Sequence, residues 1–268
     1  MDGRTVLITG ATDGLGRALA ADLSGRGARV LVHGRDPGRV SAAVAETGAA
    51  GGYVADLASL AEVRRLAADV ARDHDALHVL VSNAGIGTTL PGDGARMESA
   101  DGYELRFAVN HLAGFLLTRL LEPLLVAGAP GARIVNVASA GQMAIDFDDV
   151  MLEHGYSGTH AYCQSKLAQV MATFELAERL RDVGVTANAL HPAAYMPTKM
   201  VLHARGSGVS SLEEGVAATA RLAADPALDG VTGRYFNGTR ESRADEQAYD
   251  PAARRRLWEL SERLTGLR

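Results

Sequence analysis

A tyrosine and a lysine lie four positions apart, at Tyr162 and Lys166, in a segment with a strongly helical pattern. Residues at this spacing share one face of a helix, so the ammonium group can lie beside the phenol. A neighbouring cation favours the phenolate and lowers the pKa of a tyrosine from its usual value of about 10. The pair could therefore donate or accept a proton near neutral pH. A surface lysine beside a packed tyrosine is the simpler alternative, but only two of the 27 Lys and Arg residues are lysines.

A glycine-rich stretch, Thr9–Gly16, follows an apolar run and opens a helical pattern. Glycines let the backbone turn sharply and approach a pyrophosphate, whose charge then sits at the helix N-terminus. The stretch could be a plain strand-to-helix turn, but this place between a strand and a helix is the one that a dinucleotide-binding loop requires. We therefore expect a nucleotide cofactor to contact Gly10, Thr12, Asp13, Gly14, Leu15 and Gly16.

The end of the second predicted strand bears on the choice of nucleotide. A site specific for NAD usually has a carboxylate there that accepts the ribose hydroxyls, but this chain has Gly34 followed by Arg35. Arg35 offers a fork-shaped cation that suits a 2′-phosphate, which predicts NADP(H) as the preferred cofactor. NAD(H) is the alternative, because Asp36 follows directly and Asp13 places an acid in the phosphate loop, although Asp36 also fits a helix cap.

Short apolar or β-branched runs alternate with helical patterns along the chain. This order is typical of βαβ units and predicts an α/β, Rossmann-like, doubly wound parallel sheet with helices on both faces. No linker or repeat interrupts the pattern, so we expect one domain over residues 1–268. Ligands of such sheets bind beyond the carboxyl ends of the strands. The seven expected strands are 5–9, 29–33, 52–54, 79–82, 133–138, 185–190 and 234–236, and the expected helices start at Gly14 and Asp36 or cover 60–72, 102–126, 161–181, 212–224 and 251–264.

Composition excludes several classes of protein. The formal net charge of the 268 residues is −5, so no basic excess favours nucleic acid or an anionic membrane. The single cysteine, Cys163, forms neither an internal disulfide nor a zinc site, and we expect no metal. The first residues lack the apolar core of a signal peptide, and Arg119 and Glu122 interrupt the longest apolar stretch. We therefore expect a cytoplasmic protein that binds neither membranes nor nucleic acid.

Together these motifs resemble those of the short-chain dehydrogenase/reductase superfamily over essentially the whole chain. The segments 161–170 and 145–149 are similar to its retinol-dehydrogenase-like and WW-domain-oxidoreductase-like branch, as is the wide gap of 23 positions between Ser139 and Tyr162. The matching pieces, in chain order, are Thr9–Gly16, Asp56-Leu57, Asn83-Ala84-Gly85, Asn110, Ser139 and Tyr162 with Lys166.

The resemblance implies a catalytic set of Ser139, Tyr162, Lys166 and Asn110. Tyr162 would protonate the substrate oxygen during carbonyl reduction, or accept the proton in the reverse direction, while Ser139 would hydrogen-bond that oxygen. Lys166 would lower the pKa of Tyr162 and hold the nicotinamide ribose. Asn110 would hold a water that links Lys166 to solvent. The other cofactor contacts implied are Asp56 at the adenine, Leu57, Asn83, Ala84, Gly85, Pro192 and Tyr195.

The chain departs from the family pattern after the strand 185–190. The family usually carries Pro-Gly, an apolar residue and Thr, whereas here Ala193 follows Pro192 and Thr198 lies one position late. We therefore expect a different backbone path beside the nicotinamide. The loop 193–211 is expected to cover the substrate, and the expected pocket residues suggest a mixed, moderately apolar pocket: Gln142, Met143, Tyr156 and Met196.

The sequence thus predicts an NADP(H)-dependent oxidoreductase that interconverts a ketone or aldehyde and its alcohol by hydride transfer, as a reductase of a small or medium apolar metabolite. Two other functions stay open: a redox-neutral dehydratase or epimerase that uses Tyr162 as a base, and a cofactor sensor without turnover. The family commonly pairs the two long helices, 102–126 and 161–181, across a two-fold axis. The resemblance therefore implies a homodimer or homotetramer.

Overall fold

The structure, a computed structural model, describes residues 1–89, 95–198, 201 and 207–268. The strands within these residues are β1 (Thr5–Ile8), β2 (Arg29–Gly34), β3 (Gly51–Val54), β4 (Val79–Ser82), β5 (Ala132–Val137), β6 (Val185–His191), β7 (Tyr235–Asn237) and β8 (Arg240–Ser242). They form one sheet in the order β3-β2-β1-β4-β5-β6-β7-β8, and only β8 runs antiparallel to its neighbour. The predicted parallel sheet is confirmed, and a short edge hairpin adds an eighth strand that the sequence analysis did not predict.

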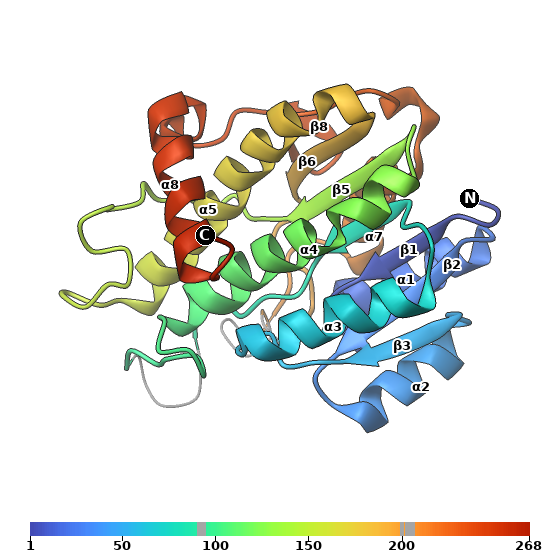
Figure 1. The fold of residues 1–268 in the computed structure, drawn as a ribbon. Coiled ribbons are helices and arrows are strands. Elements are labelled where there is room, and N and C mark those ends of the chain that lie inside the picture. The colour runs from blue at the N-terminus through green and yellow to red at the C-terminus, as the bar shows by residue number, and fades with distance from the viewer. Residues whose placement is uncertain (90–94, 199–200, 202–206) are drawn as a thin grey trace.

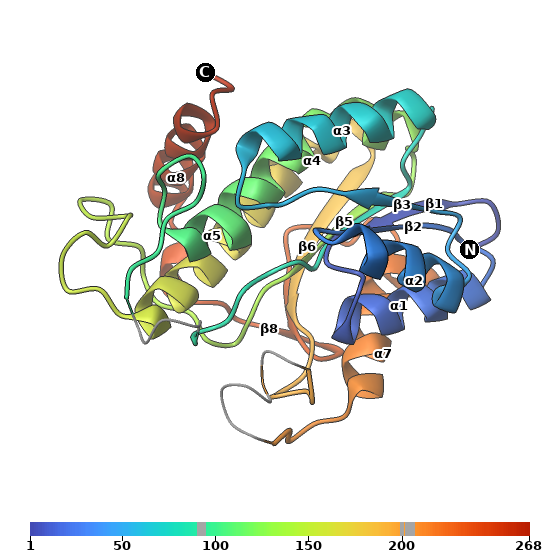
Figure 2. The ribbon, with the colours of Figure 1, turned by 90° about the horizontal axis from the view of Figure 1, so that it is seen from below.

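Helices cover both faces of the sheet (Figure 1 and Figure 2). One apolar core lies between one face of the sheet and the helices at 14–25, 37–47 and 212–224. The other core lies between the opposite face of the sheet and the remaining helices. The helices are α1 (Gly14–Gly25), α2 (Pro37–Thr47), α3 (Leu60–Asp73), the π-helical segment η1 (Phe107–Leu112), α4 (Ala113–Ala127), α5 (Gly158–Arg179), α7 (Leu212–Ala224) and α8 (Pro251–Leu264), with short 3-10 turns η2 (Arg181–Val183), η3 (Pro226–Leu228) and η4 (Glu246–Tyr249).

Capping side chains set where the helices begin. Asp36 accepts from the backbone N–H of Arg39 at the start of α2, as its place before a proline predicts. Ser157 accepts from the N–H of His160 and starts α5 three residues before the predicted position. The helix predicted from residue 102 begins instead with η1, where the backbone departs from regular α-helical geometry. Such π-helical segments are frequent at functional sites.

The segment Phe107–Ala127 is long and apolar enough to cross a membrane by length and composition alone. In this fold most of its apolar side chains lie in the core, where Leu112, Leu116 and Leu121 have no exposed surface, while Val126 is exposed. Packing beneath the sheet therefore accounts for the apolar character of this segment.

Helix α8 lies across the outer side of α4 and α5 (Figure 1). The ring of Trp258 packs edge-on against Phe115 of α4, with 4.9 Å between centroids. The guanidinium of Arg254 pairs with Glu178 of α5 over 2.6 Å. The chain's own C-terminal helix thus occupies a side of the two helices that the sequence analysis expected to pair with a second copy. The expected homodimer or homotetramer stays a prediction.

Candidate active site

The glycine-rich loop brings the backbone of three segments into close contact. Gly10 has a φ of +65°, and a Cβ there would lie 2.8 Å from the Cα of Ala84. A Cβ at Gly16 would overlap the carbonyl oxygen of Gly10. Asn83 fastens the same corner, because its side-chain Nδ2 donates to the carbonyls of Thr9 and Gly10 over 2.9 and 3.1 Å. Only glycine fits at positions 10 and 16.

This loop fits a dinucleotide. It leads from the carboxyl end of β1 into the N-terminus of α1, so backbone N–H groups and bare Cα atoms face the space where a pyrophosphate would lie. Asp13 caps the helix by accepting from the N–H of Gly14 over 2.8 Å. A Cβ at Gly14 would lie 3.1 Å from the Cγ2 of Thr198, so the segment after β6 reaches back over the phosphate loop.

The charged side chains around this loop bear on the choice between NADP and NAD. The carboxylate of Asp36, the alternative ligand of the ribose, caps α2 by accepting from the N–H of Arg39. The acid in the loop, Asp13, pairs with Arg39 over 2.9 Å. Arg35 is exposed at the tip of β2 and has no hydrogen bond or ion pair to any other residue that the structure describes. Among the described residues, nothing therefore engages the guanidinium of Arg35, and its predicted contact with a 2′-phosphate stays a prediction.

His33, which was not among the predicted site residues, connects the glycine-rich loop to the residue after β3. Its Nδ1 accepts from the N–H of Gly10 over 3.3 Å, and its Nε2 lies 3.0 Å from the carbonyl oxygen of Ala55. This arrangement needs the neutral ring, and burial lowers the pKa of His33 to about 4. Next to it, the carboxylate of Asp56 accepts from the N–H of Ala58 over 2.9 Å. Leu57, also predicted beside the adenine, is buried.

The predicted catalytic residues meet at the carboxyl end of β5. Tyr162 and Lys166 lie on α5, and the Lys166 Nζ is 5.8 Å from the centre of the Tyr162 ring. The Tyr162 side chain hydrogen-bonds that of Ser139, which also accepts from the N–H of Gly141 over 3.0 Å. The Ser139 carbonyl accepts from the hydroxyl of Tyr235 over 2.9 Å. Two neighbouring hydroxyls that could hydrogen-bond one substrate oxygen thus lie beside a backbone that hydrogen bonds hold in place.

Burial dominates the electrostatics of this pair. It raises the pKa of Tyr162, and the hydrogen bond from Ser139 offsets that rise only in part. Burial also lowers the pKa of Lys166 to about 7. The direction for Tyr162 is opposite to the one expected from the spacing alone. The reason is that spacing predicts proximity and not desolvation, which disfavours the charged form of both groups.

Asn110 holds a loop with its side chain. Its Nδ2 donates to the carbonyl of Ile86 and the hydroxyl of Ser165, over 3.1 and 2.9 Å, and its Oδ1 accepts from the N–H of Ile86 over 2.8 Å. A Cβ at Gly85 would lie 3.1 Å from this Oδ1 and 3.4 Å from the Nζ of Lys166. The side chain of Asn110 is thus hydrogen-bonded to Ile86 and to Ser165 of α5. The predicted water at Asn110 stays a prediction.

A buried ion pair that the sequence analysis missed fixes the next stretch of that loop. Arg106 is 2% exposed and donates to the carbonyls of Gly87 and Thr88, each over 2.8 Å. It also donates to the hydroxyl of Tyr156, which in turn donates to Glu104 over 3.1 Å. Tyr156 therefore ties two loops together rather than standing free. No sequence pattern identifies this pair, because a buried charged residue looks the same in the sequence as a solvated one.

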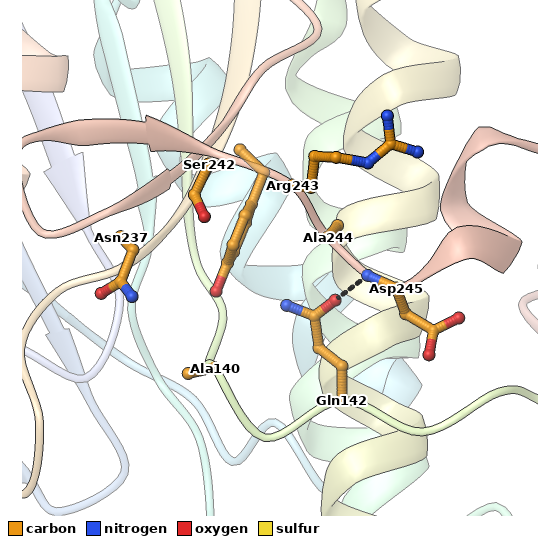
Figure 3. Close-up of a pocket in the computed structure, with 8 residues that line it drawn as sticks. Ala140, Gln142, Asn237, Ser242, Arg243, Ala244 and Asp245 are labelled. Carbon is orange, nitrogen blue, oxygen red and sulfur yellow. Dashed lines mark hydrogen bonds between the residues drawn. The ribbon is translucent and has the colours of Figure 1, made fainter.

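A pocket of about 290 Å³ is lined in part by Ala140, the residue that follows Ser139 (Figure 3). Gln142 connects the pocket to Ser139, since its Nε2 donates to the Ser139 carbonyl over 2.8 Å and its Oε1 accepts from the N–H of Asp245 over 2.9 Å. Most of the side chains that line the pocket are polar. The lining residues are Ala140, Gln142, Tyr235, Asn237, Ser242, Arg243, Ala244 and Asp245. Of the four predicted pocket residues, only Gln142 lines this pocket. The Met143 side chain is exposed, and Met196 is buried in the core beside α7.

The segment after β6 contains one unusual backbone conformation. Tyr195 has a φ of +49°, a left-handed conformation that is uncommon outside glycine. Thr198 lies beside Gly14, and the expected difference from the family's backbone path stays a prediction. Pro192 is buried at the end of β6. Residues 199–200 and 202–206 of the expected substrate-covering loop lie outside the described part of the chain.

No group of His, Cys, Asp or Glu side chains that could hold a metal ion occurs among the described residues.

A model of the short chain dehydrogenase family matches residues 4–206. The chain is 38% identical to retinol dehydrogenase 14 of Homo sapiens, over 100% of this chain and 88% of that protein. It is 37% identical to retinol dehydrogenase 13 of Homo sapiens, over 99% of this chain and 85% of that protein.

Solved structures agree with the sequence relatives. An uncharacterised protein from Mycobacterium paratuberculosis matches with a TM-score of 0.77 and 30% identity, over 99% of this chain and 94% of that one. The NADP active-site complex of RhlG from Pseudomonas aeruginosa matches with a TM-score of 0.73 and 27% identity, over 88% of this chain and 95% of that one. The chain therefore belongs to the short-chain dehydrogenase/reductase family, in the branch of the retinol dehydrogenases.

Proposed function

We propose that the protein is an NADP(H)-dependent oxidoreductase that interconverts a carbonyl compound and its alcohol, and that it works as a reductase. The observation that carries this proposal is the hydrogen-bonded pair of Ser139 and Tyr162 beside Lys166 at the carboxyl end of β5. Bound cofactor supplies or accepts the hydride. Everything else that the reaction needs comes from side chains of this chain.

The residues divide the work by position. The hydroxyls of Ser139 and Tyr162 are hydrogen-bonded to each other, so they lie close enough for one carbonyl oxygen to accept a hydrogen bond from each. Tyr162 then gives its proton to that oxygen as negative charge develops, which is general acid catalysis. The raised pKa of Tyr162 keeps the phenol protonated at neutral pH and so suits the direction of reduction. Lys166 would hold the ribose with the N–H that remains free.

The preference for NADP(H) over NAD(H) rests on three side chains. Arg35 has its guanidinium free at the tip of β2, whereas Asp36 is committed to the cap of α2 and Asp13 to Arg39. The relative RhlG was solved with NADP, which supports the same choice.

For the substrate we propose a small or medium carbonyl compound that carries a neutral polar group away from the reacting carbon. The sequence alone favoured an apolar metabolite, but the pocket that Gln142 lines is mostly polar. Asn237 and Ser242 line it on the side opposite Gln142 (Figure 3), and neither side chain has a hydrogen-bond partner among the described residues. Arg243 instead stacks on Tyr249, 4.8 Å from its centroid. Free neutral groups favour a hydroxyl or amide over an anion.

Deuterium transfer tests the reaction. The protein is incubated with NADPH that carries deuterium at the transferable position, together with hexanal or 6-hydroxyhexanal. We expect each alcohol product to gain one deuterium as NADPH is consumed. Aldehydes returned unreduced from protein saturated with NADPH would contradict an oxidoreductase and favour the cofactor sensor. A dehydrated or epimerised product without net NADPH consumption would favour the redox-neutral alternative.

The same assay tests the polar pocket. One added hydrogen bond contributes about 0.5–1.5 kcal/mol, so 6-hydroxyhexanal should have a kcat/KM about 2- to 12-fold higher than hexanal. Asn237→Ala and Ser242→Ala should reduce this ratio and leave the value for hexanal unchanged. A ratio that neither variant moves would contradict the assignment of this pocket.

We also propose that the protein acts in the cytoplasm as a soluble enzyme. The burial of the apolar segment Phe107–Ala127 in the core supports this proposal. A homo-oligomer is proposed from the family resemblance, and it would pair through surfaces other than the side of α4 and α5 that α8 covers.

A further inference from the structure

Lys166 is held from the interior of the protein by an amide outside the motif that predicted the lysine. Its Nζ donates to the Oε1 of Gln169 over 2.8 Å and to the carbonyl of Val137 over 3.0 Å. Lys166 and Gln169 are 4% and 5% exposed. An ammonium group has three N–H donors, so one remains. Gly85 lies beside that ammonium group, since a Cβ there would be 3.4 Å from the Nζ.

We propose that Gln169 is a positioning residue that aims the Lys166 ammonium group and stabilises its charged form. This proposal uses the proposed function only to say why the charge matters, namely that Lys166 serves the reaction as a cation. The contact itself belongs to α5 and does not depend on which cofactor or substrate the protein binds.

Gln169 matters because Lys166 has no charged partner within the described residues. The titratable group beside its ammonium group is Tyr162 on the same helix, and His111 lines a small cavity with Gln169 between η1 and α5. Burial lowers the pKa of His111 to about 3, so its ring is neutral. Burial lowers the pKa of Lys166 as well, to about 7. Near neutral pH, the hydrogen bond that the ammonium group donates to Gln169 therefore changes how much of the lysine is charged.

The helix holds Gln169 firmly in this place. Thr173 donates to the backbone carbonyl of Gln169 over 2.7 Å, and the side chain of Asn136 on β5 donates to the Thr173 hydroxyl over 2.7 Å. Both partners are buried. The amide therefore projects toward Lys166 from a turn that is tied to the sheet.

The composition of the chain makes a direct test possible, because it has only two lysines, Lys166 and Lys199. Protein labelled with 13C at the lysine Cε gives two lysine signals, which Lys199→Arg assigns, and the pH midpoint of each is read by NMR. Gln169→Leu removes a hydrogen bond to a charged group, so we expect the Lys166 midpoint to fall by about 1–2 pH units. Gln169→Glu keeps the shape and adds a negative charge, so we expect the midpoint to rise.

Gln164→Leu is the matched control. Gln164 is 1% exposed on the same helix, but its amide donates to the carbonyl of Val150 over 2.8 Å and not to Lys166. We expect its Lys166 midpoint to equal that of the wild type. Midpoints that stay at the wild-type value in both Gln169 variants, or that move in one direction in both, would overturn the proposal.

The isosteric Gln169→Glu keeps the test decisive if the leucine variant does not fold, because a midpoint that fails to rise in it contradicts the proposal by itself. The proposed function is checked separately by NADPH titration of the same samples. Opposite midpoint shifts without NADPH binding would retain the role of Gln169 and reject the oxidoreductase.

Discussion

The two ends of the candidate site are built from different materials. The nucleotide end consists of backbone and bare glycines, with one exposed guanidinium, Arg35, at its rim. The reaction end consists of buried side chains, and Lys166 and Ser139 are both less than a tenth exposed. At the first end, geometry alone excludes other residues. At the second, desolvation sets the protonation of each group, so the same residues in another environment would behave differently.

The reaction end should show the largest response to a single change. Tyr162→Phe removes the phenolic proton but keeps the ring, so we expect the rate of carbonyl reduction to fall by about 10²–10⁴-fold. NADPH affinity should be unchanged, because the variant leaves the nucleotide end intact. Tyr53→Phe is the control, since that hydroxyl contacts Asp73 and His74 far from the site. A Tyr162→Phe enzyme with most of its rate would show that another group is the acid.

The glycine-rich loop of the nucleotide end should respond to added bulk. Gly16→Ala puts a methyl group against the Gly10 carbonyl, which we expect to lower the free energy of unfolding by about 1–3 kcal/mol and NADPH affinity by about tenfold. Gly25→Ala in the same helix meets no atom within 4 Å and should be tolerated. Chemical denaturation and fluorescence titration measure both effects. Equal behaviour of the two variants would mean that the loop is not the rigid cradle described above.

Two buried histidines are neutral, His33 at the nucleotide end and His111 on η1. Their pKa values, about 4 and about 3, lie below the usual 6.5 of the unfolded chain. The unfolded state therefore binds more protons as the pH falls below about 6.5, and folding stability decreases with it, by at most about 1.4 kcal/mol per pH unit for each histidine. Above pH 6.5 this contribution is fully present.

Denaturation of His111→Gln between pH 6.5 and 5 isolates one of these contributions. We expect the slope of stability against pH to decrease relative to the wild type by at most about 1.4 kcal/mol per pH unit, the contribution of one histidine. An unchanged slope would show that His111 is not held neutral in the folded protein.

The same contrast explains what the sequence could predict. Glycine spacing between a strand and a helix identified the nucleotide loop, and the alternation of elements identified the parallel sheet, because both follow from local rules. The Tyr162 and Lys166 spacing identified the catalytic pair for the same reason. The direction of the Tyr162 pKa, the buried Arg106 and Glu104 pair and the role of α8 depend on contacts between distant segments, which no local pattern encodes. The edge hairpin is too short to give a periodic signal.

Parallel titration with NADPH and NADH, followed by nicotinamide fluorescence in the wild type and in Arg35→Ala, tests the cofactor assignment most directly. We expect the wild type to bind NADPH about 10- to 100-fold more tightly than NADH, because charge-assisted hydrogen bonds to the 2′-phosphate contribute about 1.5–3 kcal/mol. Arg35→Ala should abolish that preference, whereas Arg17→Ala, which breaks an exposed pair with Glu46, should keep it. Equal wild-type affinities, or equal losses for both cofactors in Arg35→Ala, would contradict NADP(H) dependence through Arg35.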